Sequence, residues 1–173
     1  MQLIEECKRG SRDAQFRLYN QYSKAMFNLA LRMTSNREDA EDILQEAFVD
    51  CFRNISTFRY KSTFGAWLKS IVINRSINHL RKKKVALYFP ETLPDTPADN
   101  EPEPEYSVEK IVKGIGLLPD GYRIILTLYL LEGYDHTEIS EILGISESTS
   151  KSQYSRAKEK LRKLIKQNGT WIN

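Results

Sequence analysis

Apolar side chains recur every three or four residues along most of the chain, which is the spacing of one face of an α-helix. From residue 11 to residue 33 the predicted apolar stripe comprises Phe16, Tyr19, Tyr22, Met26, Leu29, Ala30 and Met33. After residue 36 the same spacing continues with Ile43, Leu44, Ala47, Phe48, Cys51, Phe52 and Ile55. Ser11 and Asn36 are of the types that cap helix starts, so two helices are predicted. No alternating run bounded by turn residues predicts a strand.

A further helix is predicted from about Ala66 to Lys84, after the loop sequence FRYKSTFG. One of its faces is mostly polar and carries Trp67, Ile71, Asn74, Asn78 and Arg81. Amides and arginine beside an aromatic ring suit the reading of base edges and stacking on bases. The loop could close a pocket over an unstacked base with Lys61, Ser62, Thr63 and Phe64. The alternatives are aromatic core packing and, for residues 82–84, a solvated helix end.

The C-terminal block is predicted to hold four short helices. The first lies near Val108–Leu118, and the second opens at Pro119 and Asp120. Typical start and stop residues bound the last two: Asp135 with Glu138, Gly144, and Ser146.

The last two helices and their glycine turn fit a helix-turn-helix. A helix enters the major groove of DNA only if its leading face is not bulky, and here that face holds small hydroxyl residues and long basic ones. The candidate DNA-binding residues are Ser148, Thr149, Lys151, Ser152, Gln153, Ser155 and Arg156. The alternative is an amphipathic hairpin with a solvated basic face.

Charge and proline divide the 173 residues into three parts. Residues 1–84 contain 16 Lys and Arg against 9 acids, and residues 107–173 contain 10 against 8. Between them, residues 85–106 contain 6 acids, no Lys or Arg, and five of the six prolines. Proline interrupts regular structure, so this segment predicts an acidic, extended linker. The predicted fold is all-α, with helical domains at 1–84 and 107–173, and two basic blocks suggest a nucleic-acid partner.

The composition, 40% apolar and 28% charged, is that of a globular protein. No apolar run is long enough to cross a membrane, and the N-terminus lacks a signal-peptide core, so no membrane insertion and a cytoplasmic location are expected. Cys7 and Cys51 belong to no CxxC pair and are expected to be reduced packing residues. His79 and His136 are the only histidines, so neither a metal site nor a cofactor is predicted.

The stretch REDAEDILQE, residues 37–46, admits three interpretations. Metal-holding carboxylates need opposing acids from a second helix, and residues 1–84 contain no second acidic cluster. A solvated helix face is the simplest interpretation. A docking face is favoured by Val49, which adds apolar surface among the acids, as at partner interfaces.

Taken together, these segments resemble the extracytoplasmic-function group of bacterial sigma factors. DAEDILQEAFVDCFRNISTF resembles the polymerase-binding segment of sigma region 2, and STFGAWLKSIVINRSINHLRKKK the segment that melts and reads the −10 element. LPDGYRIILTLYLLEGYDHTEISEILGISESTSKSQYSRAKEKLRKL resembles region 4 with its −35-reading helix. The resemblance covers nearly all of residues 1–166.

The resemblance implies a transcription initiation factor that binds core RNA polymerase, promoter DNA and an anti-sigma factor. It assigns polymerase docking to Asp39, Asp42, Gln45, Glu46 and the neighbouring Val49 surface. It assigns capture of a flipped −10 base to residues 61–64, other −10 contacts to Asn74 and Asn78, and −35 contacts to Lys151, Ser152, Ser155 and Arg156. No catalytic residue is implied, because polymerase performs the chemistry, so the chain is not expected to be an enzyme.

The chain departs from the family pattern where Ser140, Ser148, Ser150 and Gln153 replace the usual alanine, glycine, aliphatic and basic residues. The −35 preference is therefore expected to be its own. The alternative functions are a standalone helix-turn-helix repressor and, from the acidic pairs, a magnesium-dependent all-helical nucleotide pyrophosphatase.

Overall fold

The computed structural model describes residues 2–83 and 107–167, and these residues form helices, turns and loops without a strand. The chain divides into two compact units, Met1–Lys84 (unit 1) and Val85–Asn173 (unit 2). The predicted all-α fold is confirmed. The predicted acidic linker falls on residues 85–106, outside the described residues.

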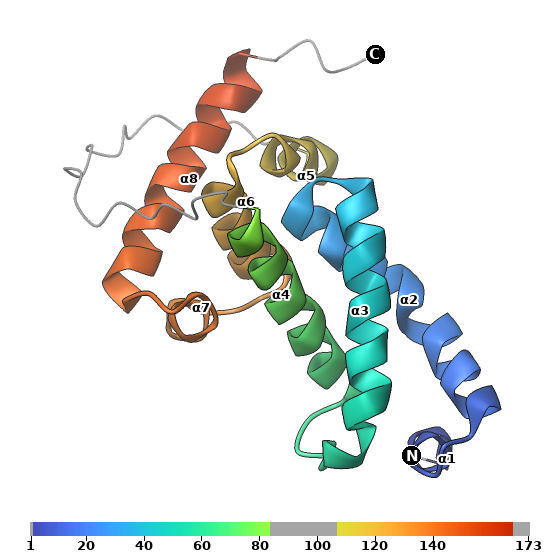
Figure 1. The fold of residues 1–173 in the computed structure, drawn as a ribbon. Helices are drawn as coiled ribbons and strands as arrows, with labels where there is room; N and C mark the ends of the chain where they lie inside the picture. The colour runs from blue at the N-terminus through green and yellow to red at the C-terminus, as the bar shows by residue number, and fades with distance from the viewer. Residues whose placement is uncertain (1, 84–106, 168–173) are drawn as a thin grey trace. The chain divides into compact units, whose positions relative to one another are not determined.

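Unit 1 is a bundle of three long helices with one short helix against the start of the first (Figure 1). The long helices α2, α3 and α4 each pack against the other two, and the short helix α1 packs on α2 and on the 3-10 turn η1. The bounds are α1 Gln2–Lys8, α2 Arg12–Thr34, α3 Arg37–Asn54, η1 Ile55–Thr57 and α4 Phe64–Lys82.

Side-chain caps fix where these helices begin. Ser11 accepts a hydrogen bond from the Ala14 amide at 3.3 Å, and Asn36 accepts one from the Asp39 amide at 3.0 Å, as predicted. Thr63 caps α4 by accepting from the Ala66 amide at 3.1 Å. This helix therefore starts at Phe64, two residues earlier than predicted, because the threonine hydroxyl satisfies an amide of the first turn.

The core of unit 1 confirms most of the predicted apolar positions and corrects one. Leu29, Met33 and Ile43 are fully buried. Phe16 was predicted to belong to the buried stripe of α2, but it is 64% exposed, and Leu18 packs inward in its place. The buried side of α2 starts at Ala14, so Phe16 lies off that face.

The two cysteines are free thiols buried in this core, as the sequence predicted. Burial raises the pKa of the Cys51 thiol to about 12 and also raises that of Cys7. Both side chains therefore stay protonated at neutral pH and act as small apolar groups.

Unit 2 contains α5 (Val108–Gly116), α6 (Asp120–Leu126), a π-helical turn η2 (Thr127–Leu131), α7 (His136–Leu143) and α8 (Glu147–Gln167). The long helix α8 packs against α5, α6 and α7. The hydrophobic core of unit 2 holds Ile115, Leu118, Leu126, Ala157 and Leu161.

Two polar arrangements hold the turns of unit 2. Asp135 and Glu138 form the predicted capping box at the start of α7, and Gly144 ends that helix with φ of 65°, a conformation that favours glycine. The Arg123 guanidinium is buried, pairs with Asp120 and donates to the Leu118 carbonyl at 2.9 Å. Burial lowers the pKa of Arg123, and these partners compensate its desolvation.

No helix among residues 2–83 and 107–167 is long and apolar enough to cross a membrane. Over the same residues, no three His, Cys, Asp or Glu side chains gather as metal ligands would.

Candidate functional sites

The outer face of α3 exposes four of the five predicted docking residues. Asp42, Gln45, Glu46 and Val49 are open to solvent, and Val49 is 53% exposed. Their spacing of three and four residues places them on one side of the helix. This face combines carboxylates, an amide and one aliphatic group, which suits a basic partner with some apolar surface.

Asp39, the fifth predicted docking residue, is largely covered and pairs with residues at the end of α4. Its carboxylate accepts hydrogen bonds at 2.6 Å and 2.7 Å from Lys83, the residue that follows α4, and lies 3.2 Å from His79 Nε2 of α4. Burial opposes its ionisation, but Lys83 and His79 outweigh burial and lower the pKa of Asp39. Its side chain is 14% exposed, so this carboxylate serves contact between α3 and α4.

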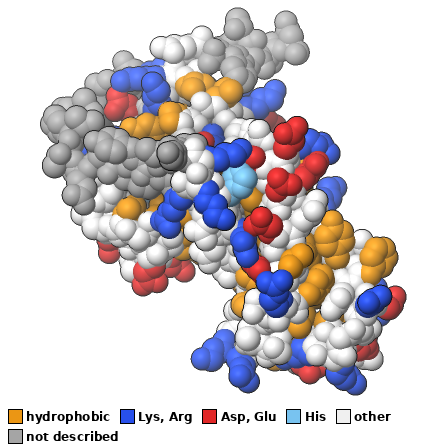
Figure 2. All heavy atoms as spheres, viewed as in Figure 1, with side chains coloured by type: hydrophobic (Ala, Val, Ile, Leu, Met, Phe, Trp, Pro, Cys, Tyr) orange, Lys and Arg blue, Asp and Glu red, His pale blue; other side chains and the backbone are white. Residues whose placement is uncertain are grey.

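A second ion-pair group joins the same two helices. Arg75 of α4 donates to Asp50 at 2.5 Å and to Glu46 at 3.1 Å. Figure 2 shows acidic and basic side chains next to one another over α3 and α4. Glu46 therefore lies on the exposed face of α3 and also contacts α4. The sequence pattern did not indicate its long-range pairing with Arg75.

An open groove of about 510 Å³ lies between α3 and α4. It is lined by Trp67, Ile71, Asn74, Asn78, Arg75, Asp50, Asn54 and Thr57. The predicted polar face of α4 supplies the first four of these. Asn54 and Thr57, with Asp50, extend the lining from the end of α3 and its following turn. The sequence prediction missed these three, although their four- and three-residue spacing is that of a shared helix face.

The loop before α4 exposes Lys61, Ser62 and Thr63 but not Phe64. The Phe64 ring is 4% exposed and packs at 5.3 Å from Tyr22 and 5.7 Å from Phe58, centroid to centroid. Phe64 was predicted to help close a pocket over a base. Because neighbouring side chains cover the Phe64 ring, this residue supports the loop from beneath and does not line its exposed surface.

The helix-turn-helix geometry of α7 and α8 separates the predicted DNA-binding residues into two groups. Ser148, Lys151 and Ser155 are exposed, and Ser152 and Arg156 are partly exposed, all on one side of α8. Thr149 and Gln153 are buried, the latter fully. They line the inner side of α8, where Thr149, Gln153, Ala157 and Leu161 follow one another at four-residue steps. Both Thr149 and Gln153 were predicted to lie on the exposed face, and burial corrects this.

A polar contact in this inner side links the two helices. His136 Nδ1 lies 3.0 Å from the hydroxyl of the buried Ser150. The imidazole stacks on Tyr129 with centroids 4.7 Å apart and meets the edge of Tyr154 at 5.4 Å. The serine at position 150 therefore has a structural partner in this chain.

Acid should destabilise unit 2 through this histidine. Burial and the Lys151 charge lower the pKa of His136 below 6.5, so the folded state prefers the neutral ring. Between the folded and unfolded pKa values the unfolded chain binds more protons, and the free energy of unfolding falls as pH drops through that window. We expect hydrogen-exchange protection in α6–α8 to fall from about pH 7 to about pH 5 and the variant His136→Asn to lose this dependence. A dependence kept by His136→Asn, or lost in the control His79→Asn of unit 1, would contradict it.

Comparison with known proteins assigns the two units to one class. Residues 18–85 match Sigma-70 region 2, and residues 109–161 match Sigma-70, region 4. The crystallised sigma factor RpoE from Bartonella quintana, in complex with the anti-sigma factor NepR, shares the fold with a TM-score of 0.59 and 23% identity, over 87% of this chain and 95% of that one. The chain thus has the two domains of a sigma factor.

Sequence similarity narrows the class further. The chain is 33% identical to the ECF RNA polymerase sigma factor SigW of Bacillus subtilis, over 94% of its own length and 95% of the relative. It is 31% identical to SigM of the same organism, over 85% and 92% of the two chains. The chain belongs to the extracytoplasmic-function (ECF) RNA polymerase sigma factors, transcription initiation factors that direct RNA polymerase to promoters. Neither the repressor nor the pyrophosphatase alternative is favoured, because both sigma regions are present in order.

Proposed function

We propose that unit 1 docks on core RNA polymerase and opens the −10 element, while unit 2 reads the −35 element. The observation that carries this assignment is the groove of unit 1. It places the exposed amides Asn74 and Asn78 on its rim, in the segment matched to sigma region 2.

The groove and the adjacent loop offer the chemistry that strand opening needs. Asparagine amides can form paired hydrogen bonds to a base edge, and Trp67 and Ile71 add apolar surface beside them. Lys61 and Ser62 of the exposed loop supply a phosphate-binding cation and a small hydroxyl donor. A base that leaves the stack loses a few kcal/mol of stacking and pairing, which such contacts offset. Arg81, exposed one turn beyond Asn78, is placed to extend the contact along the phosphate backbone.

The exposed face of α8 is proposed to lie in the major groove of the −35 element. The proposed contacts are Ser148, Lys151, Ser152, Ser155 and Arg156. Small hydroxyl residues at the start of α8 allow close approach to base edges, and the basic residues neutralise phosphates. Thr149 and Gln153 are left out of this surface because they are buried. They are proposed to orient α8 instead.

The proposed partners follow from the same family. Docking on core RNA polymerase is assigned to Asp42, Gln45, Glu46 and Val49, the exposed face of α3. An anti-sigma partner is supported by RpoE, whose similar fold was crystallised with NepR. We place the action of the chain in the cytoplasm, where bacterial RNA polymerase works, and infer that it performs no catalysis of its own.

The −10 assignment is tested by the double variant Asn74→Ala/Asn78→Ala. We expect holoenzyme carrying it to open promoter DNA at least about thirtyfold less, because two amide pairs are lost and each is worth about 1–3 kcal/mol. Opening is followed by the fluorescence of 2-aminopurine placed in the −10 element. Asn28→Ala, an exposed amide on α2, is the matched control and should open DNA as the wild type does. Unchanged opening by the double variant would refute the assignment of the groove to the −10 element.

A further inference from the structure

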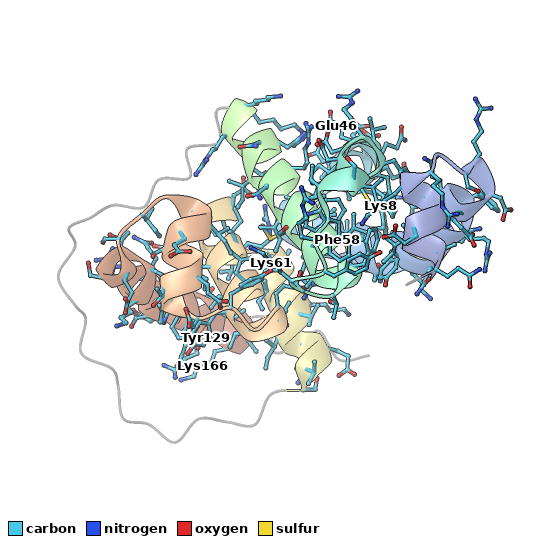
Figure 3. All side chains as sticks on the ribbon, turned by 90° about the horizontal axis from the view of Figure 1, so that it is seen from below. Lys8, Glu46, Phe58, Lys61, Tyr129 and Lys166 are labelled. Carbon is cyan, nitrogen blue, oxygen red and sulfur yellow. The ribbon has the colours of Figure 1, made fainter. Side chains whose placement is uncertain are left out.

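The loop that precedes α4 is tied to α1, a helix that lies ahead of the segment matched to sigma region 2. Tyr60 Oη donates a hydrogen bond of 2.6 Å to Glu5 Oε1. Lys8 Nζ donates to the same carboxylate oxygen at 3.0 Å and to the Phe58 carbonyl oxygen at 3.1 Å. The Lys8 ammonium also lies 4.5 Å from the centroid of the Tyr60 ring. Lys8 and Phe58 are seen close together in Figure 3.

These contacts form one small network, which we name the α1 latch: Glu5, Lys8, Phe58 and Tyr60. Each hydrogen bond of the latch involves a charged group, either the Glu5 carboxylate or the Lys8 ammonium. The hydrogen bond from Tyr60 and then that from Lys8 lower the pKa of Glu5, while the Glu5 partner raises the pKa of Tyr60. A carboxylate that accepts from a phenol and from an ammonium makes stronger hydrogen bonds than neutral groups do.

The latch holds a segment of backbone in a conformation that is otherwise unfavourable. Tyr60 has φ of 58° and is one of two described non-glycine residues with positive φ, a conformation that L residues avoid. Its ring packs at 4.8 Å from that of Phe58, which is buried against Phe64 and Trp67. Lys61 and Ser62 follow Tyr60 directly, and Thr63 closes the segment as the cap of α4. The exposed tip is therefore fixed at both of its ends.

We infer that α1 is a positioning element for promoter opening, which holds residues 61–63 through the α1 latch in the shape that receives the unstacked −10 base. This inference rests on the proposed function of the loop. Glu5, Lys8 and Tyr60 need not touch DNA in this arrangement. A binding loop that is already ordered loses less conformational entropy when the base arrives, so loosening the latch weakens base capture and leaves docking on α3 intact.

The test compares Glu5→Gln and Tyr60→Phe with wild type in holoenzyme on promoter DNA with 2-aminopurine in the −10 element. Tyr60→Phe removes the phenol–carboxylate bond, Glu5→Gln replaces its charged acceptor with a weaker neutral amide oxygen, and both keep the size of the side chain. We expect opening to fall about threefold to tenfold in each, with core-polymerase affinity and −35 duplex affinity within about twofold of wild type. The double variant should lose less than the sum of the two single effects, because both changes act on the same bond. A general loss of stability would instead add the two effects.

Glu6→Gln is the matched control. It removes the same charge from the same helix, and the Glu6 carboxylate accepts a hydrogen bond from Gln2 of α1, which is not part of the latch. It should open DNA as wild type does. Wild-type opening by Glu5→Gln and Tyr60→Phe, or an equal loss in Glu6→Gln, would overturn the latch while leaving the proposed function standing. Failure of the wild-type holoenzyme to open the −10 element would overturn the proposed function itself. Thermal unfolding of each variant, followed by circular dichroism, identifies any that fails to fold, and Lys8→Met then tests the network from its other side with the same expected loss of opening.

Discussion

Replacement of Asp42 by lysine should lower the affinity of the chain for core RNA polymerase about tenfold to a hundredfold. Asp42 is exposed on the outer face of α3 and, among residues 2–83 and 107–167, has no ion-pair partner. A lysine there puts a positive charge against a surface that we propose to be basic. Glu46 is a poorer choice for this test because it also pairs with Arg75 of α4, so its reversal would disturb two helices at once.

Titration of fluorescently labelled core polymerase measures the effect of Asp42→Lys. Glu41→Lys is the matched control: it makes the same charge change on the adjacent residue, about 100° further round the helix. Glu41 is paired with Arg37 at the surface, and such pairs contribute little to stability. Binding of unit 2 to −35 duplex should be the same in both variants. Equal core affinities for Asp42→Lys and Glu41→Lys would show that this face of α3 does not dock.

The second large effect is expected at the other end of the chain. Lys151→Glu should lower the affinity for −35 duplex DNA about a hundredfold at about 0.1 M salt, because a phosphate-binding cation becomes an anion at the DNA surface. Lys151 is exposed on α8 and paired with Glu147 at 2.6 Å, so its ammonium already lies at the start of the proposed reading helix. Lys151→Ala should reduce the slope of log affinity against log salt by about one.

Binding is measured by fluorescence anisotropy of labelled duplex over a range of salt concentrations. The control, Lys113→Glu, makes the same charge change on the exposed side of α5 and reports the general effect of net charge. Affinity that falls equally in Lys113→Glu and Lys151→Glu would mean that the loss comes from overall charge and that α8 is not the reading helix.

Helix boundaries were predictable because local chemistry sets them. Ser11, Asn36 and the Asp135–Glu138 pair each satisfy amides within a few residues of themselves, so the signal is complete in a short stretch of sequence. Gly144 ends α7 for an equally local reason, its positive φ.

Burial was less predictable where polar residues face inward. Thr149, Ser150 and Gln153 lie on the buried side of α8 although their side chains are polar, and their polarity led to two of them being assigned to DNA. Only their register with Ala157 and Leu161 distinguishes them from the exposed set. Phe16 shows the reverse error: its helical spacing predicts a core position, but the aromatic ring is exposed.

Contacts between distant segments lay beyond the sequence pattern. Asp39 with Lys83 and Glu5 with Tyr60 join residues separated by 44 and 55 positions. Such pairs depend on how α3 packs on α4, and on how α1 packs on the loop that precedes α4. Charge spacing along one helix carries no information about these pairings, so the sequence does not distinguish Asp39 from the other predicted docking residues of α3.

Promoter-directed initiation is the central claim, and run-off transcription by core RNA polymerase with and without the chain tests it most directly. The template should carry a promoter selected from random −35 and −10 sequences by the holoenzyme, since we expect the −35 preference of this chain to be its own. We predict transcripts that start at one position, require the chain, and fall sharply when either element is replaced. Transcription that the chain leaves unchanged or only represses would contradict the claim.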